Sequence, residues 1–148
     1  MFIDPHFDPS KPRYHDFFSL LGEINQLERK PLIEIHRCCY HGSGKKRQLI
    51  DGDEMKAIFQ TTFKKLMGDI SFRIEVFIWD DFHDRHIISN LVGYQLGNGL
   101  DTTKADAKTT WTRLGRKDSD DIQREFDPSS GIHKLQKRFS LMNRQTTL

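Results

Sequence analysis

Residues 71–101 read SFRIEVFIWDDFHDRHIISNLVGYQLGNGLD, and this stretch decides the predicted fold. Its first apolar positions recur at every second residue and are β-branched or aromatic: Phe72, Ile74, Val76 and Ile78. This period predicts a buried strand. The polar residues 80–81 and 83–86 follow, and a second apolar run then leads to the turn Gly97-Asn98-Gly99. Because α/β sheets place functional residues at the ends of buried strands, the same stretch is where we expect a site.

The remaining elements are predicted outward from this stretch. Apolar periodicity and turn residues predict strands at 2–4, 32–35, 72–78, 87–88, 93–96 and 109–114, and helices at 14–27, from Asp51 or Asp53 to Gly68, and at 118–126. Residues from Ile132 onward are expected to form a basic tail. Alternating strands and helices followed by a hairpin predict an α/β fold with a mixed β-sheet and helices on both faces.

The length and composition limit the alternatives. The chain of 148 residues is predicted to be one domain over residues 1–142, with a flexible tail at 143–148. The net charge of +2 does not by itself indicate a nucleic-acid binder. No apolar run is long enough for a transmembrane helix, and the start lacks the order of a signal peptide. A disulfide between the adjacent Cys38 and Cys39 would be strained, so a reducing, cytoplasmic location is expected.

The spacing within the central stretch resembles the phospholipase D superfamily. The signature of that family is His-x-Lys, four residues, Asp, and then a glycine-rich segment that carries Asn. Here it reads His83-x-Arg85, four residues, Asn90, then Gly97-Asn98, so Arg stands for Lys and Asn for Asp. The form HDRxxIxN…GxGLD is most similar to the phospholipase D-like domains of the MIT-domain C-terminal type and of small bacterial proteins. This resemblance implies a three-layer sandwich.

The resemblance also implies roles for individual residues. In the family, one histidine attacks phosphorus, a second protonates the leaving group, and no metal or other cofactor is needed. Carried over, His83 is the nucleophile or the general acid, Arg85 the phosphate clamp and Asn98 a further donor, with Asn90 also at the phosphate. Neutral imidazole is a nucleophile, and guanidinium binds phosphate oxygens in pairs. A single motif implies a homodimer in which the two copies of His83 meet.

Further candidates lie outside the central stretch. Asp4 and His6 follow the first strand and are predicted to border the same cleft, the alternative being a capping aspartate at a proline-stopped strand. The loop 41–47 carries Lys45, Lys46 and Arg47, which could grip a nucleic-acid backbone or simply be solvated. The crowded run 36–41 lacks the paired ligand spacing of structural zinc sites, so no metal is predicted.

Two classes of function remain open from the sequence. The first is a phosphodiesterase or nuclease that acts on nucleic acid rather than lipid, since no basic amphipathic membrane helix is evident. The second is a non-catalytic module that binds nucleic acid, phospholipid or protein, or that dimerises, through a degenerate site. The Asn at position 90 and the single motif favour this second class. The chain could also be an interaction domain within a longer protein.

Overall fold

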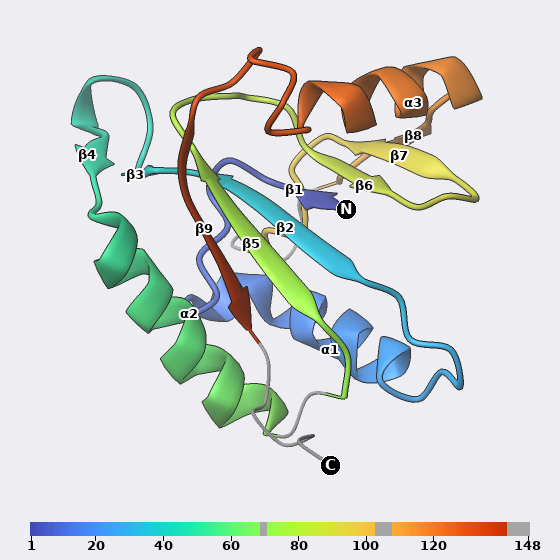
Figure 1. Cartoon of the computed structure of the whole chain (residues 1–148), viewed down its shortest axis with the longest axis horizontal. Coiled ribbons are helices and arrows are strands. Elements are labelled where there is room, and N and C mark those ends of the chain that lie inside the picture. The colour runs from blue at the N-terminus through green and yellow to red at the C-terminus, as the bar shows by residue number, and fades with distance from the viewer. Residues whose placement is uncertain (69–70, 103–107, 142–148) are drawn as a thin grey trace.

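The computed structural model describes residues 1–68, 71–102 and 108–141, and it is an α/β fold built on one mixed sheet. The described strands of this sheet follow the order β8-β7-β6-β1-β2-β5-β9 (Figure 1). Their bounds are β1 Phe2–Ile3, β2 Ile33–Cys38, β5 Ile74–Trp79, β6 His86–Ile88, β7 Gly93–Leu96, β8 Trp111–Arg113 and β9 Leu135–Leu141. The predicted α/β class with a mixed sheet is therefore confirmed.

The short strand β1 decides which loops meet at the edge of the sheet. It pairs in parallel with β2 and antiparallel with β6, so that Ile3 lies opposite both His36 and His86. Strand β2 is also parallel to β5. The carboxyl ends of β1, β2 and β5 therefore share one edge with the start of β6. This places the residues after β1 beside those that precede β6.

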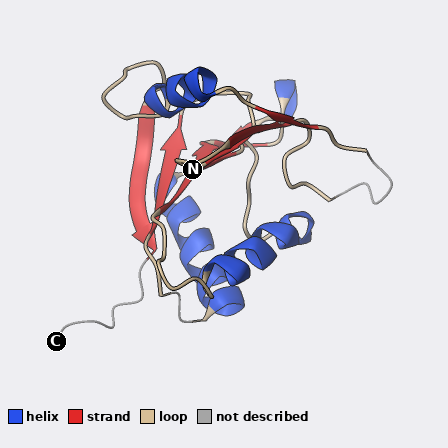
Figure 2. Cartoon of the chain, turned by 90° about the vertical axis from the view of Figure 1, so that its right-hand side faces the viewer, coloured by secondary structure: helices blue, strands red, loops and turns tan. Residues whose placement is uncertain are grey.

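Helices cover both faces of the sheet. On one face lie α1 (His15–Ile24) and α2 (Gly52–Met67), and α3 (Arg116–Glu125) lies on the other, as the separation of the helices in Figure 2 shows. The carboxylate of Asp51 accepts hydrogen bonds from the backbone N–H groups of Asp53 and Glu54 and so caps α2. The apolar stripes of α1 and α2 bury against β2 and β5 through Phe17, Phe18, Leu21, Met55, Phe59 and Phe63.

The face covered by α3 holds a smaller aromatic core around His36. The imidazole of His36 stacks on Phe77, with ring centroids 4.7 Å apart, and its Nδ1 accepts a hydrogen bond from Nε1 of Trp79 at 3.1 Å. Phe126 packs edge-on against both His36 and Trp79. Burial lowers the pKa of His36, against the opposing effect of Glu34. His36 is thus a neutral residue of this core.

The basic loop predicted at residues 41–47 is part of a small ribbon. Strands β3 (Tyr40–His41) and β4 (Gln48–Leu49) pair antiparallel, and a single 3₁₀ turn, η2 (Gly44–Lys46), lies between them. A second such turn, η1 (Pro12–Tyr14), precedes α1. Both turns lie near the carboxyl ends of the central strands. They supply much of the wall of the site described below.

The structure differs from the sequence expectation at three elements. Leu135–Leu141, expected within a basic tail, forms β9 antiparallel to β5, because Phe139 and Leu141 alternate with exposed residues and bury on the α2 face. Residues 80–85 form a loop instead of the end of a strand. The strand expected at 109–114 is reduced to β8, whose residues are all exposed. The predicted flexible tail, 143–148, lies outside the described residues.

Within the ranges that the structure describes, no helix has both the length and the apolar character needed to cross a bilayer. The longest one, α2, has an exposed face that carries lysines and acidic residues.

Candidate anion-binding site

Asp4 lies at the centre of the candidate site, immediately after β1. One of its oxygens, Oδ1, accepts a hydrogen bond from the backbone N–H of His6 at 2.9 Å and lies 3.6 Å from Nε of Arg85. Burial raises the pKa of this carboxyl, and the His6 N–H and the Arg85 guanidinium act against that rise. The side chain has no exposed surface. Asp4 therefore positions Arg85 and the loop at His6; it was predicted to border the cleft together with His6, but only His6 is among the residues that line it.

Gly99 closes the other side of this carboxylate. Its φ of +63° lies in the left-handed region, and a Cβ atom there would fall 2.5 Å from Oδ2 of Asp4 and 2.9 Å from Cδ of Arg85. Only glycine allows the backbone to approach so closely. The glycine-rich segment expected at the site thus packs directly against the pair of Asp4 and Arg85.

The residues after Gly99 join the site to η1. Oδ2 of Asp101 lies 3.6 Å from Nε of Arg13, and the backbone N–H and hydroxyl of Thr102 both donate to the carbonyl of Arg13, at 2.9 and 3.0 Å. These contacts hold the turn after β7 against the turn before α1. They bring Arg13, which the sequence analysis did not single out, beside Arg85.

Arg13 and Arg85 line a cleft of about 190 Å³. It is called the larger cleft below, to distinguish it from a smaller one that adjoins it. Their side chains are 41% and 27% exposed, so both can be reached from solvent. The rest of the lining consists of His6, Tyr14, Tyr40, His41, Gly42, Ser43 and Asp101, and the carboxylate of Asp101 pairs with Arg13. A cleft lined by two guanidinium groups and several polar side chains is suited to binding an anion.

A second, smaller cleft of about 60 Å³ adjoins the larger one. The two share His6, Tyr40, Gly42 and Ser43 in their linings, and the smaller cleft adds Arg47, Asp81 and His83 among others. Nη1 of Arg47 bonds to Oδ2 of Asp81 at 2.7 Å, and its guanidinium covers the ring of Tyr40 at 4.2 Å. His83 and Arg85 were predicted to share one face of a strand, but both lie in the loop before β6. His83 lines the smaller cleft and Arg85 lines the larger one.

His6 stands between the two clefts and is half-buried. Burial is the main reason that its pKa is lowered, and the nearby charges of Arg85, Arg37, Arg13 and His83 lower it further. The imidazole is therefore neutral near pH 7, with one nitrogen free to accept a proton.

Arg37 holds the walls of both clefts in place. Its side chain is fully buried and donates to the carbonyl oxygens of Cys38 at 2.7 Å, Phe7 at 2.8 Å and Tyr40 at 2.7 Å. One guanidinium therefore ties the loop after β1 to the end of β2 and to β3. Sequence reasoning missed this role, although Arg37 continues the inward alternation of Ile33 and Ile35.

The other predicted site residues lie elsewhere. Asn90 is exposed in the turn after β6, at the opposite end of that strand from Arg85, because three residues of β6 separate the two loops. Asn98 is exposed, and its backbone N–H donates to Oγ1 of Thr109 at 3.5 Å, so it is not among the residues that line either cleft. Lys45 and Lys46 are exposed on η2, next to Gly44 in the smaller cleft.

Among the described residues, no group of three or more His, Cys, Asp or Glu side chains is arranged to hold a metal ion. Both cysteines are free thiols, and burial raises the pKa of Cys38 to about 12.

Comparisons with known proteins identify no family. No protein family model matches the chain, and no match is found among curated proteins or solved structures. Inference about function therefore depends on the geometry of the two clefts.

Proposed function

We propose that this chain is a phospholipase D-like domain that binds a phosphodiester, and that nucleic acid is its ligand. The observation that carries the proposal is the convergence of Arg13, Arg85 and neutral His6 on one cleft from three separate segments. Guanidinium groups form paired, charge-assisted hydrogen bonds with phosphate oxygens. A neutral imidazole beside them can accept or donate a further bond without repelling the cations.

The size of the site supports a small charged group as the part that is bound. The larger cleft, about 190 Å³, is below the range of pockets that enclose a whole drug-sized ligand. It is large enough for a phosphoryl group with part of its sugar. The hydroxyl of Ser43 and the backbone at Gly42 line both clefts and offer further polar contacts.

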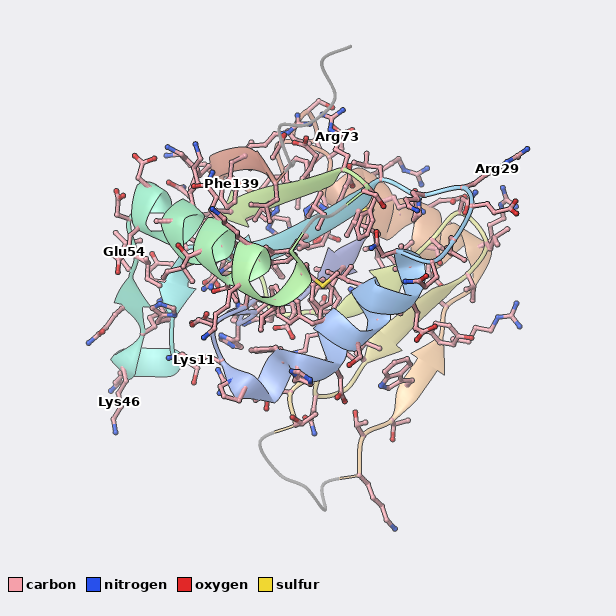
Figure 3. The ribbon with its side chains drawn as sticks, turned by 90° about the horizontal axis from the view of Figure 1, so that it is seen from below. Lys11, Arg29, Lys46, Glu54, Arg73 and Phe139 are labelled. Atoms are coloured by element: carbon pink, nitrogen blue, oxygen red, sulfur yellow. The ribbon has the colours of Figure 1, made fainter. Side chains whose placement is uncertain are left out.

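Exposed lysines around the clefts favour an extended polyanion. Lys11 precedes η1, and Lys45 and Lys46 lie on η2, so these cations flank the two turns that form the wall. Lys11 and Lys46 point toward the same end of the molecule, whereas Arg29 lies at the opposite end (Figure 3). Neighbouring phosphates of a nucleic-acid strand would reach these lysines, since a basic surface follows the backbone of a bound strand.

Two features support the phospholipase D-like assignment. The mixed sheet is covered on both faces by helices, as that fold requires, and the segment GxGLD meets the Asp4–Arg85 pair through Gly99. The homodimer implied by the resemblance, with one His83 from each copy, stays a prediction.

Fluorescence anisotropy with labelled single-stranded RNA and DNA tests the proposal. We expect binding that weakens steeply with salt, and a loss of about 10- to 100-fold in Arg85→Ala or Arg13→Ala, since a charge-assisted hydrogen bond contributes about 1.5–3 kcal/mol. Arg29→Ala is the matched control, because Arg29 is exposed and far from the clefts. Absence of binding at low salt, or equal losses in all three variants, would contradict the proposal. Preference for phosphoinositide liposomes would exclude nucleic acid as the ligand.

A further inference from the structure

We infer that His6 and His83 of one and the same chain form a base and acid pair that cleaves RNA by internal transfer to the 2′-oxygen. This inference rests on the phosphodiester binding proposed above and adds a reaction to it. The resemblance had implied a histidine nucleophile and a second histidine from another copy. Here two histidines already line one cleft within a single chain.

The geometry brings the two imidazoles together from distant parts of the sequence. His6 belongs to the loop after β1, and His83 to the loop between β5 and β6. Both line the smaller cleft, and His6 also lines the larger one, where Arg13 and Arg85 lie. A phosphoryl group held by the two guanidinium groups would therefore lie in the cleft that His6 lines, and the adjoining cleft leads from there to His83.

The two histidines have different surroundings. The cations Arg85, Arg37 and Arg13 gather around His6, and together with burial they keep its pKa low. A general base must start neutral, and His6 meets this requirement. The carboxylate of Asp81, fixed by Arg47, lines the cleft with His83. His83 is exposed, and as the other imidazole of this cleft it is assigned the role of general acid.

The reaction needs no partner besides the substrate. His6 accepts the proton of the 2′-hydroxyl as the 2′-oxygen forms a bond to phosphorus. The bond from phosphorus to the 5′-oxygen breaks, and His83 donates a proton to that oxygen. The products are a 2′,3′-cyclic phosphate and a free 5′-hydroxyl, and solvent returns the two histidines to their starting states. Arg13 and Arg85 stabilise the added negative charge on the phosphoryl oxygens.

RNA is the substrate that fits this arrangement. It carries its own nucleophile next to the scissile phosphorus, and the 2′-hydroxyl is what distinguishes RNA from DNA at a site. The larger cleft of about 190 Å³, which holds the phosphoryl group with part of its sugar, leaves no room for a base as well. Bases would remain outside it, so the site would cleave single-stranded RNA with little preference for sequence.

The test is a labelled single-stranded RNA oligonucleotide, assayed against the same sequence with one 2′-deoxy substitution at each position in turn. We expect a 2′,3′-cyclic phosphate end and no cleavage 3′ of a 2′-deoxynucleotide. His6→Ala and His83→Ala should each lower the rate by about 10²- to 10⁴-fold, the usual contribution of general acid–base catalysis. His15→Ala, purified in parallel, is the control for contaminating ribonuclease and for histidine loss in general, because His15 is exposed on α1.

A substrate with a 5′-thio leaving group separates catalysis from structure. Thiolate leaves without a proton, so this substrate should restore the rate of His83→Ala and leave His6→Ala slow. Binding by anisotropy is measured on the same samples. RNA that binds but stays intact, cleavage that does not depend on the 2′-hydroxyl, or a phosphohistidine trapped by quenching would each overturn the inference while leaving the proposed binding intact. Absence of binding would remove both.

Discussion

Replacing Gly99 by alanine tests how tightly the glycine turn packs against the site. The new Cβ would fall 2.5 Å from Oδ2 of Asp4 and 2.9 Å from Cδ of Arg85. Asp4 cannot move aside easily, because it is fully buried and held by the N–H of His6. The left-handed conformation costs alanine about 1–2 kcal/mol, and overpacking adds about 1–3 kcal/mol. We therefore expect the free energy of unfolding to fall by about 2–5 kcal/mol.

Urea denaturation, followed by far-ultraviolet circular dichroism, measures this loss as a lower midpoint at an unchanged slope. Gly131→Ala is a matched control, since Gly131 has a φ of +71° but no atom within 4 Å of its Cβ position. It should lose only the conformational part, about 1–2 kcal/mol. Equal losses in the two variants would refute the argument, because the close approach to Asp4 and Arg85 would then have no energetic effect. Gly99→Ala should also weaken RNA binding, whereas Gly131→Ala should not.

Three further predictions concern buried polar groups. Arg37→Met should lower the free energy of unfolding, measured by urea titration, by about 3–5 kcal/mol, because three backbone carbonyls lose their donor. A loss below about 1 kcal/mol would contradict the structural role of Arg37. Because burial lowers the pKa of His36, the unfolded chain binds more protons there, so stability should be full above about pH 6.5 and decline below it by up to about 1.4 kcal/mol per pH unit. Between pH 7 and 5 the urea midpoint should fall less steeply in His36→Gln than in the wild-type protein. The same pH dependence in both proteins would refute the lowered pKa of His36. Burial raises the pKa of Cys38 to about 12, so this thiol should react with a thiol reagent at pH 8 no faster than the chain unfolds. The reaction rate of the Cys39→Ser variant, in which Cys38 is the remaining thiol, is measured with and without urea.

The central part of the fold could be predicted because its residues carry a strong local signal. The alternation at residues 72–78 and the apolar stripes of the two long helices follow directly from which face is buried. Strand β9 escaped prediction because Lys137 and Arg138 mask its period, and their side chains lie over other groups: Lys137 pairs with Asp53, and Arg138 pairs with Glu75 and covers Phe77. A pairing partner far away in the sequence decides whether such a segment becomes a strand.

The candidate site was predictable only in part, for a similar reason. Asp4, His6 and Arg85 could be named because they lie at the ends of predicted strands. Arg13 could not, because its place beside Arg85 depends on two tertiary contacts, with Asp101 and Thr102. Spacing had also grouped Asn90 with the site, but a strand of three residues followed by a tight turn carries it to the opposite edge.

The pairing of β9 with β5 has a consequence for synthesis on the ribosome. Every residue of β5 is buried in the finished sheet, yet the strand that covers its outer edge follows the other described strands of that sheet along the chain. Until residues 135–141 emerge, the nascent chain presents an uncovered apolar edge of the kind that recruits other strands. Chains interrupted before that point should therefore be the ones that chaperones retain and that aggregate, although the residues that line the two clefts have already been translated.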